Sequence, residues 1–250
     1  MTQTINDTLN IIIPVFNEGD NIRKTITEIQ QKVDLKNYLI YIVYDFPEDN
    51  TLPVVKDIIK QNKLDNILLL KNKYGKGALN AIKTGLEAVN EGAALVVMAD
   101  LSDDFAAVKP MLEMMSSGYD IVCGSRYMKG GKQIGGPLLK KFLSRMAGVT
   151  LHYLVRIPTH DVTNSFKLYS KKVLDAINIE STGGFEIGME IVVKSYIKGF
   201  KIGEVPSIWF DRVSGESNFK LWQWLPRYIH WYLYAIRNIL IRQLRREDYA

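Results

Sequence analysis

The stretch AALVVMADLSDD, residues 93–104, joins a wholly apolar run to a cluster of acids directly after it. Such an uninterrupted apolar run is typical of a strand that is buried on both faces of a sheet. Related runs lie at 9–16 (LNIIIPVF), 39–46 (LIYIVYDF) and 66–70 (NILLL), with helical patterns between them at 21–33, 52–61 and 77–90. Strict alternation of strand and helix predicts an α/β fold in which helices cover both faces of a mostly parallel sheet.

The second half of the chain changes character. DIVCGSRYM at 120–128 predicts a further strand, MKGGKQIGGP at 128–137 a glycine-rich mobile loop, and 138–155 a helix with an apolar stripe. Beyond Pro158 we expect a strand at 166–170 (FKLYS), a helix near 186–198 and a strand at 200–210 (FKIGEVPSIWF). The position of the loop suggests that it lies beside a site.

Composition narrows the class of protein. The chain has 250 residues, of which 47% are hydrophobic and 24% charged, and this fits one principal globular domain. A net charge of +5 is too mild to indicate nucleic-acid binding, but it suits phosphate-bearing ligands or an anionic membrane surface. A single cysteine, Cys123, excludes an intramolecular disulfide and indicates a reducing compartment. The N-terminus has no basic region and its apolar run stops at Pro14, so we expect neither a signal peptide nor a membrane span there.

Polar side chains follow the predicted strands at the edge where ligands bind in open parallel sheets. Asp100, Asp103 and Asp104 place three carboxylates within five residues of the turn after 93–99. Asp100, together with Ser102 or Asp103 and the oxygens of a diphosphate, could complete an octahedral shell around Mg²⁺ or Mn²⁺. Asp103 and Asp104 equally fit caps of the helix that begins near Phe105.

The segment NKYGKGALN, residues 72–80, places two glycines and two lysines just before a helix. Its backbone amides and Lys73 or Lys76 could face an anion, although it matches neither the phosphate-loop motif nor the dinucleotide fingerprint. The sequence has no GxSxG or HExxH motif, and His152, His160 and His230 are scattered, which argues against a hydrolytic triad.

The last forty residues are rich in aromatic side chains and arginine. On a helix, Arg227, Arg237, Arg242 and Arg245 share one arc, and the opposite arc holds Leu225, Tyr228, Ile229, Tyr232, Ile236, Ile239 and Leu240. The apolar length is too short, and too often interrupted by arginine, for a transmembrane helix. We therefore expect an amphipathic helix that lies on a membrane surface. Packing against the domain or against a second copy of the chain is the alternative.

Eight segments follow one another in the order seen in family 2 glycosyltransferases, and together they resemble the polyprenyl-phosphate hexosyltransferases typified by dolichol-phosphate mannose synthase. They are IIIPVFNE, VYDFPEDNT, KYGKGALNAIKTGL, VVMADLSDD, CGSRY, DVTNSFKLYSKKVL, GGFEIGMEIVVKSYIKGFKIGEVP and DRVSGESNFKL. The resemblance implies a GT-A (Rossmann-like) catalytic domain at 1–215, followed by amphipathic membrane-interface or dimerisation helices at 216–250. It also implies a metal-dependent, inverting glycosyltransferase.

The resemblance also assigns roles to residues. It places the nucleotide sugar near Pro14, Glu18, Asp45 and Lys76. Asp100 matches the metal ligand of the family's DxD motif, and Ser102 matches its polar neighbour. The basic residues that would hold the donor diphosphate or the acceptor phosphate are Arg126, Arg145 and Arg212, since guanidinium donates to such oxygens in a planar fork.

Two departures affect the donor side. Met98 stands where the family's DAD motif has its first acid, and Tyr44 stands where its DDGS motif has its first acid. The identity of the donor, a GDP-sugar or a UDP-sugar, is therefore left open by the sequence.

The expected reaction moves a hexose from a nucleotide-diphosphate sugar to undecaprenyl or dolichyl phosphate, with the protein bound peripherally at the cytoplasmic face of a membrane. A transferase for a glycan or other soluble acceptor is the first alternative, with the tail serving a homo-oligomer and Glu186 or Asp104 as base. The others are a non-catalytic sugar-nucleotide-binding protein and a nucleotidyltransferase.

Overall fold

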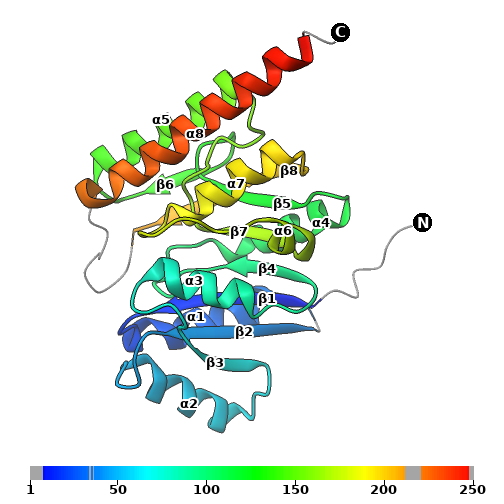
Figure 1. Cartoon of the computed structure of the whole chain (residues 1–250). Coiled ribbons are helices and arrows are strands. Elements are labelled where there is room, and N and C mark those ends of the chain that lie inside the picture. The colour runs from blue at the N-terminus through cyan, green and yellow to red at the C-terminus, as the bar shows by residue number, and fades with distance from the viewer. Residues whose placement is uncertain (1–7, 34, 36, 212–220, 248–250) are drawn as a thin grey trace.

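The computed structural model describes residues 8–33, 35, 37–211 and 221–247, and in the last helix the side chains of residues 222–241. Seven strands form the main sheet in the order β3-β2-β1-β4-β7-β5-β8, which runs through the molecule from bottom to top in Figure 1. These strands are β1 (Leu9–Val15), β2 (Tyr38–Tyr44), β3 (Ile67–Lys71), β4 (Ala93–Val96), β5 (Ile121–Ser125), β7 (Lys167–Ser170) and β8 (Ile202–Pro206).

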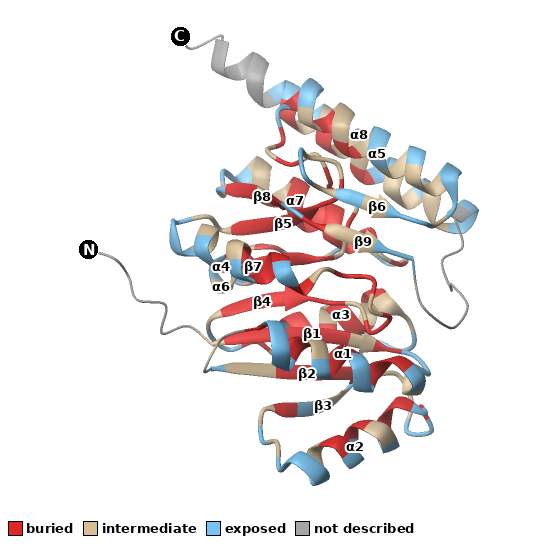
Figure 2. Ribbon diagram, turned by 180° about the vertical axis from the view of Figure 1, so that it is seen from behind, coloured by how far each residue is buried: buried red, intermediate tan, exposed pale blue. Residues whose placement is uncertain are grey.

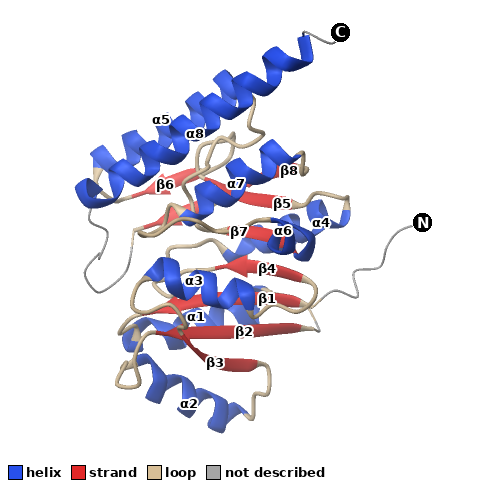
Figure 3. Cartoon of the chain, in the orientation of Figure 1, coloured by secondary structure: helices blue, strands red, loops and turns tan. Residues whose placement is uncertain are grey.

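Helices connect the strands and cover both faces of the sheet, as Figure 3 shows. They are α1 (Gly19–Lys32), α2 (Thr51–Asn62), α3 (Ala78–Glu87), the short 3₁₀ helix η1 (Phe105–Ala107), α4 (Val108–Ser116), α5 (Leu138–Val155), α6 (Lys171–Ala176), α7 (Ile187–Lys198) and α8 (Leu221–Glu247). The helix predicted at 138–155 is confirmed with the same bounds.

The predicted mostly parallel sheet is confirmed. β3, β2, β1 and β4 are parallel neighbours, and β5 pairs in parallel with β8. β7 lies antiparallel between β4 and β5, with Lys167 level with Val96 on one side and Cys123 on the other. This arrangement brings the carboxyl ends of β1, β2, β4 and β5 to one edge of the sheet.

Side chains alternate between two cores, one on each face of the sheet. Ile12 and Val96 pack with α3, α7 and α8 on one face. Ile11, Ile13 and Leu95 pack with α1, α2 and α4 on the other. Figure 2 shows the central strands buried along most of their length, which explains why their sequences are apolar without alternation.

A second, two-stranded sheet lies beside the main one. It pairs β6 (Lys132–Ile134) with β9 (Ile208–Phe210) in parallel. The predicted single strand at 200–210 was therefore wrong, because β8 ends at Pro206 and the chain passes to the second sheet at Ser207. Proline has no N–H to donate to a ladder. The glycine-rich segment, predicted as a loop, contributes β6.

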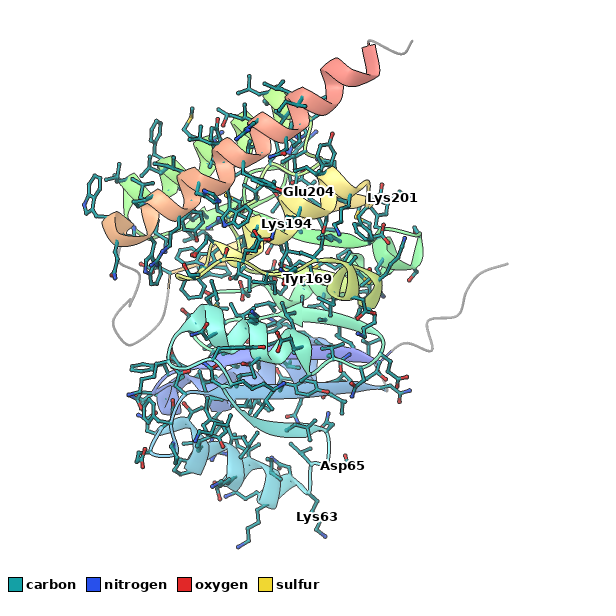
Figure 4. The ribbon with its side chains drawn as sticks, viewed as in Figure 1. Lys63, Asp65, Tyr169, Lys194, Lys201 and Glu204 are labelled. Carbon is teal, nitrogen blue, oxygen red and sulfur yellow. The ribbon has the colours of Figure 1, made fainter. Side chains whose placement is uncertain are left out.

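The C-terminal helix α8 packs against α5 and α7 of its own chain. Trp231, Ala235 and Ile239 are buried, and the Trp231 indole N–H donates to Ser181 Oγ at 2.9 Å. Lys194 of α7, labelled in Figure 4, places its ammonium 5.0 Å from the centroid of the Trp231 ring. Among the described residues, no helix is both long enough and apolar enough to cross a membrane.

Candidate active site

A cavity of about 1240 Å³ opens at the edge where the parallel strands end. One wall is polar and comes from the strand ends, and the opposite wall comes from α5 and α8. Seven of the residues predicted for the site line it: Pro14, Glu18, Asp45, Lys76, Asp100, Ser102 and Arg126.

The turn after β4 carries Asp100 into the cavity wall. The Thr25 hydroxyl donates to the Ala99 carbonyl at 2.8 Å, and the Ser102 N–H donates to Asp100 Oδ1 at 3.2 Å. Leu101 adopts a left-handed backbone with φ of 61°, so the chain reverses within one residue. The turn thus holds Asp100 and Ser102 on one short arc.

The two acids that follow have structural partners. Asp103 is buried and accepts the Met98 N–H at 2.8 Å. Burial raises the pKa of the Asp103 carboxyl to about 7, although the Met98 N–H opposes the shift, and the negative charge of Asp100 adds to it. Asp104 caps η1 by accepting the Ala106 N–H at 3.0 Å, so the predicted capping role of Asp104 is confirmed.

Asp45, at the end of β2, fixes the loop that carries Lys76. Its carboxylate accepts from the Asn72 amide at 2.7 Å and from the Gly77 N–H at 2.9 Å. Gly77 has φ of 129°, a backbone conformation that favours glycine, and this conformation directs its N–H toward Asp45. Asp45 thus connects the strand end to the start of α3.

Two phenylalanines stand beside Lys76. The rings of Phe16 and Phe46 meet edge to face at 5.6 Å between centroids, and the Lys76 ammonium lies 5.0 Å from the Phe46 centroid. Phe16 lines the cavity and is 46% exposed. A flat apolar surface next to a cation suits a nucleobase with its attached phosphates.

Asp49 is a residue of the site region that the sequence analysis did not identify, and it orders the segment after β1. It is buried, and its carboxylate accepts the N–H groups of Asn17 at 3.1 Å and Thr51 at 2.9 Å. The Thr51 hydroxyl accepts the Glu18 N–H at 2.9 Å. The Asp49–Thr51 spacing at the start of α2 is the signal that could have indicated this turn.

Arg126 forms a buried ion pair with Asp161 at the end of β5. Its Nε and Nη2 donate to the two oxygens of the carboxylate at 2.7 and 2.9 Å, and Nη2 also donates to Thr163 Oγ1 at 3.0 Å. Burial disfavours ionisation of Asp161, yet the Arg126 guanidinium holds the pKa of that carboxyl below its ordinary value. Arg126 therefore faces the cavity as a fixed, charge-balanced donor.

The α5 helix places a different cation in the cavity from the one that the family motif suggested. Lys140 lines the cavity one turn before Ser144, which also lines it. Arg145 is exposed and is not among the lining residues. The remaining predicted arginine, Arg212, lies outside the described residues, directly after Asp211, which lines the cavity.

The far wall of the cavity is apolar. Leu139, Leu143 and Met146 of α5 line it together with Leu225 and Ile229 of α8. Several large apolar side chains of the two helices are exposed, and they include Leu138, Phe142, Trp222, Leu233 and Leu240. Of the seven residues in the apolar arc predicted for α8, Ile239 is buried, Ile229 and Leu240 are exposed, and the other four are partly buried. Trp222, Leu233 and Leu240 form an exposed apolar line along α8.

Comparison with known proteins identifies this architecture. The model of the family described as "Glycosyl transferase family 2" matches residues 10–177, more than half of the chain. The chain belongs to glycosyltransferase family 2. Among solved structures, glucosyl-3-phosphoglycerate synthase from Mycobacterium tuberculosis is similar. This holds for its complex with Mn²⁺, UDP and phosphoglyceric acid (TM-score 0.67) and for its complex with Mn²⁺, UDP-glucose and phosphoglyceric acid (TM-score 0.66). In both cases the sequences are 14% identical and the match covers 92% of this chain. It covers 79% of the chain in the first structure and 80% in the second. The similarity confirms the predicted GT-A fold.

Two proteins of known name are similar to this chain in sequence. A dolichol-phosphate mannosyltransferase of Pyrococcus furiosus is 29% identical over 216 residues, which cover 85% of this chain and 59% of that protein. A polyprenol monophosphomannose synthase of Mycolicibacterium smegmatis is 24% identical over 230 residues, which cover 86% of this chain and 85% of that protein. The chain thus spans about three fifths of the first relative and most of the second.

Replacing Asp161 with asparagine should destabilise this family 2 glycosyltransferase, because the buried Arg126 would keep its charge without a balancing carboxylate. We expect the free energy of unfolding in urea at pH 7 to fall by about 3–5 kcal/mol. The matched control is Asp57→Asn, which breaks the exposed Arg23–Asp57 pair and should cost about 1 kcal/mol or less. Equal losses for the two variants would show that the buried pair has no special weight.

Proposed function

We propose that this chain is an inverting hexosyltransferase that uses a nucleotide-diphosphate sugar and a polyprenyl phosphate. The observation that carries the proposal is the continuity of one cavity from the polar strand ends to the apolar wall between α5 and α8. A nucleotide sugar needs polar groups for its phosphates, and a polyprenyl phosphate needs polar groups for its phosphate and an apolar surface for its chain. A cavity with one polar and one apolar part meets both needs. The names of the two sequence relatives, which concern mannose transfer to dolichol or polyprenol phosphate, support the same acceptor class.

The nucleotide sugar, a GDP- or a UDP-sugar, would lie along the strand ends. Phe16 offers a ring face to the base, and Pro14, Glu18 and Asp45 border the same end of the cavity. Lys76 would balance phosphate charge. Arg212 is proposed to hold the donor diphosphate, as its place in the DRVSGES motif implies.

The residues at the turn after β4 fit a hard divalent cation. Asp100 and Ser102 offer oxygen ligands and would bind Mg²⁺ or Mn²⁺ together with donor phosphate oxygens. Among the described residues, no three His, Cys, Asp or Glu side chains form a metal cluster. The negative charge of Asp100 adds to the cost of ionising the buried Asp103, and a cation at this turn would relieve that cost. When bound, the metal supplies positive charge that stabilises the departing nucleoside diphosphate.

The acceptor phosphate would lie between Arg126 and the α5 wall, with its isoprenoid chain against the apolar side chains of α5 and α8. An oxygen of the phosphate attacks the anomeric carbon as the bond from that carbon to the diphosphate breaks, which inverts the configuration. The nucleophile is already anionic near neutral pH, so positioning and charge stabilisation supply the acceleration. Residues 1–215 would form the catalytic domain, with 216–250 as its membrane-interface extension.

The engagement of nearby carboxylates disfavours a sugar hydroxyl as acceptor. Such an acceptor needs a base, and Glu186 and Asp104 are the candidates. Glu186 is buried and accepts the N–H groups of Gly183 and Gly184 at 2.9 and 2.7 Å, while Asp104 caps η1. Both carboxylates are thus used to hold the backbone.

The decisive test is incubation with labelled GDP- and UDP-sugars, undecaprenyl or dolichyl phosphate, and Mn²⁺ or Mg²⁺. We expect label in the organic phase, lost with EDTA, and a fall in turnover of about 100-fold or more for Asp100→Asn. Asp104→Asn, which alters a cap, should retain turnover. Label that appears only with a glycan acceptor, or full metal-dependent turnover by Asp100→Asn, would contradict the proposal.

A second prediction distinguishes the two cations of α5. Because Lys140 lines the cavity and Arg145 does not, Lys140→Ala should raise KM for the polyprenyl phosphate by about tenfold or more, the effect of one charge-assisted hydrogen bond. Arg145→Ala should change it by less than about threefold. The opposite order of effects would return the acceptor role to Arg145, as the family motif implies.

We propose that the exposed apolar line on α8 rests on the cytoplasmic face of a membrane. Trp222 and Leu233 are 75% and 58% exposed, and residues eleven apart lie almost in line on a helix. Trp222→Ser with Leu233→Ser should reduce sedimentation with vesicles of phosphatidylcholine and phosphatidylglycerol, whereas Gln223→Ser with His230→Ser should not. Deleting α8 would be a poor test, since it also removes buried Trp231 and Ala235. Equal binding by both double variants would refute the membrane role of this line.

A further inference from the structure

Tyr127, directly after Arg126, joins three elements of the site through one hydroxyl group. The phenol donates to Gln133 Oε1 of β6 at 2.9 Å and contacts Ser144 Oγ of α5. Its ring lies 4.9 Å from the guanidinium carbon of Arg126. The end of β5, the second sheet and α5 therefore meet at this side chain.

The two halves of α5 are fixed in different ways. In the C-terminal half, Leu151 and Val155 are fully buried, and a Cβ at Gly148 would lie 2.0 Å from the His160 carbonyl oxygen. In the N-terminal half, Leu138 and Phe142 are 82% and 60% exposed. Apolar burial therefore anchors residues 148–155 more strongly than residues 138–146.

Polar contacts fasten the N-terminal half instead. They include the contact between Tyr127 and Ser144, and the bond from the Lys141 ammonium to the Gln133 carbonyl at 3.0 Å. Both tie α5 to the end of β5 or to β6. Because the Tyr127 hydroxyl contacts both Gln133 and Ser144, it links this half of the helix to the end of β5 and to β6 at once.

This fastening bears on the cavity because Arg126, Gln133 and Ser144 all line it. Lys140 lies one helical turn from Ser144 on the same wall. We propose that Tyr127 is a positioning residue, which holds the N-terminal half of α5 at a set distance from Arg126 and thereby sets the affinity for the acceptor phosphate. The identity of the acceptor in this inference rests on the proposed function. The role of Tyr127 in holding α5 does not depend on it.

The first test is Tyr127→Phe, which removes the hydroxyl and keeps the ring against Arg126. We expect KM for the polyprenyl phosphate to rise on the order of tenfold, as for loss of one hydrogen-bonded group, with KM for the nucleotide sugar unchanged. The matched control is Tyr153→Phe on the same helix, where the side chain is 72% exposed, and neither constant should change. Equal rises in both constants for Tyr127→Phe, or no rise, would overturn the proposal.

A double-mutant cycle with Ser144→Ala tests whether Tyr127 acts through α5. If it does, the double variant should have nearly the same acceptor KM as the more impaired single variant. Additive effects would mean that the Tyr127 hydroxyl acts independently of Ser144, and would overturn the positioning role.

Hydrogen–deuterium exchange provides a readout that needs no substrate. In Tyr127→Phe, amide exchange should accelerate at 138–146 and stay unchanged at 149–155. Unchanged exchange, or a uniform rise over both segments, would refute the positioning role even if the enzyme is active. If the wild-type chain transfers no sugar to polyprenyl phosphate, the proposed function fails, and the exchange result still decides the role of Tyr127.

Discussion

The buried pair between Arg126 and Asp161 is the interaction on which the geometry of the site depends. A guanidinium removed from water needs a partner with matched geometry, and Asp161 supplies both carboxylate oxygens. Asp161 belongs to the segment that leads into β7, where the buried Lys167 donates to the carbonyls of Val162 and Asn164. Asp161, which pairs with Arg126, and Lys167, which binds two backbone carbonyls, therefore hold the segment that enters the antiparallel strand β7. Since β7 lies between β4 and β5, this segment sets the distance between the turn of Asp100 and the turn of Arg126.

The sequence predicted the parts of the fold that depend on local pattern. Apolar runs without alternation predicted the buried strands, and the apolar stripe predicted α5 with its bounds. The pattern did not predict that 200–210 splits into β8 and β9 or that β6 forms, because these strands of three to five residues are defined by distant partners. The antiparallel direction of β7 likewise follows from tertiary contacts, which hydrophobic periodicity does not encode.

The predicted site residues that follow strand ends line the cavity, whereas the predicted Arg145 on helix α5 does not. Pro14, Asp45 and Asp100 reach the cavity because the strand end fixes where they lie. On α5, the rotation of the helix about its axis decides which cation faces the cavity. Gly148 and Leu151 set that rotation through tertiary contacts, which local sequence pattern does not encode. At about 100° per residue, Lys140 and Arg145 lie on opposite sides of the buried face that these two residues form. A motif position alone therefore did not identify the cation in the wall.

The way in which the carboxylates are used also constrains the chemistry. Asp103, Asp161 and Glu186 each accept hydrogen bonds from backbone N–H groups, and Asp161 balances a guanidinium as well. Carboxylates used in this way stabilise turns. To act as a base toward an acceptor hydroxyl, such a carboxylate would have to give up its hydrogen bonds to the backbone. An acceptor that arrives already anionic avoids this conflict, since its reaction needs cations to hold two phosphate groups close together against their mutual repulsion. Lys76, Lys140 and the paired Arg126 line the cavity from the loop before α3, from α5 and from the end of β5, so cations can donate to the two phosphates from three directions along the chain.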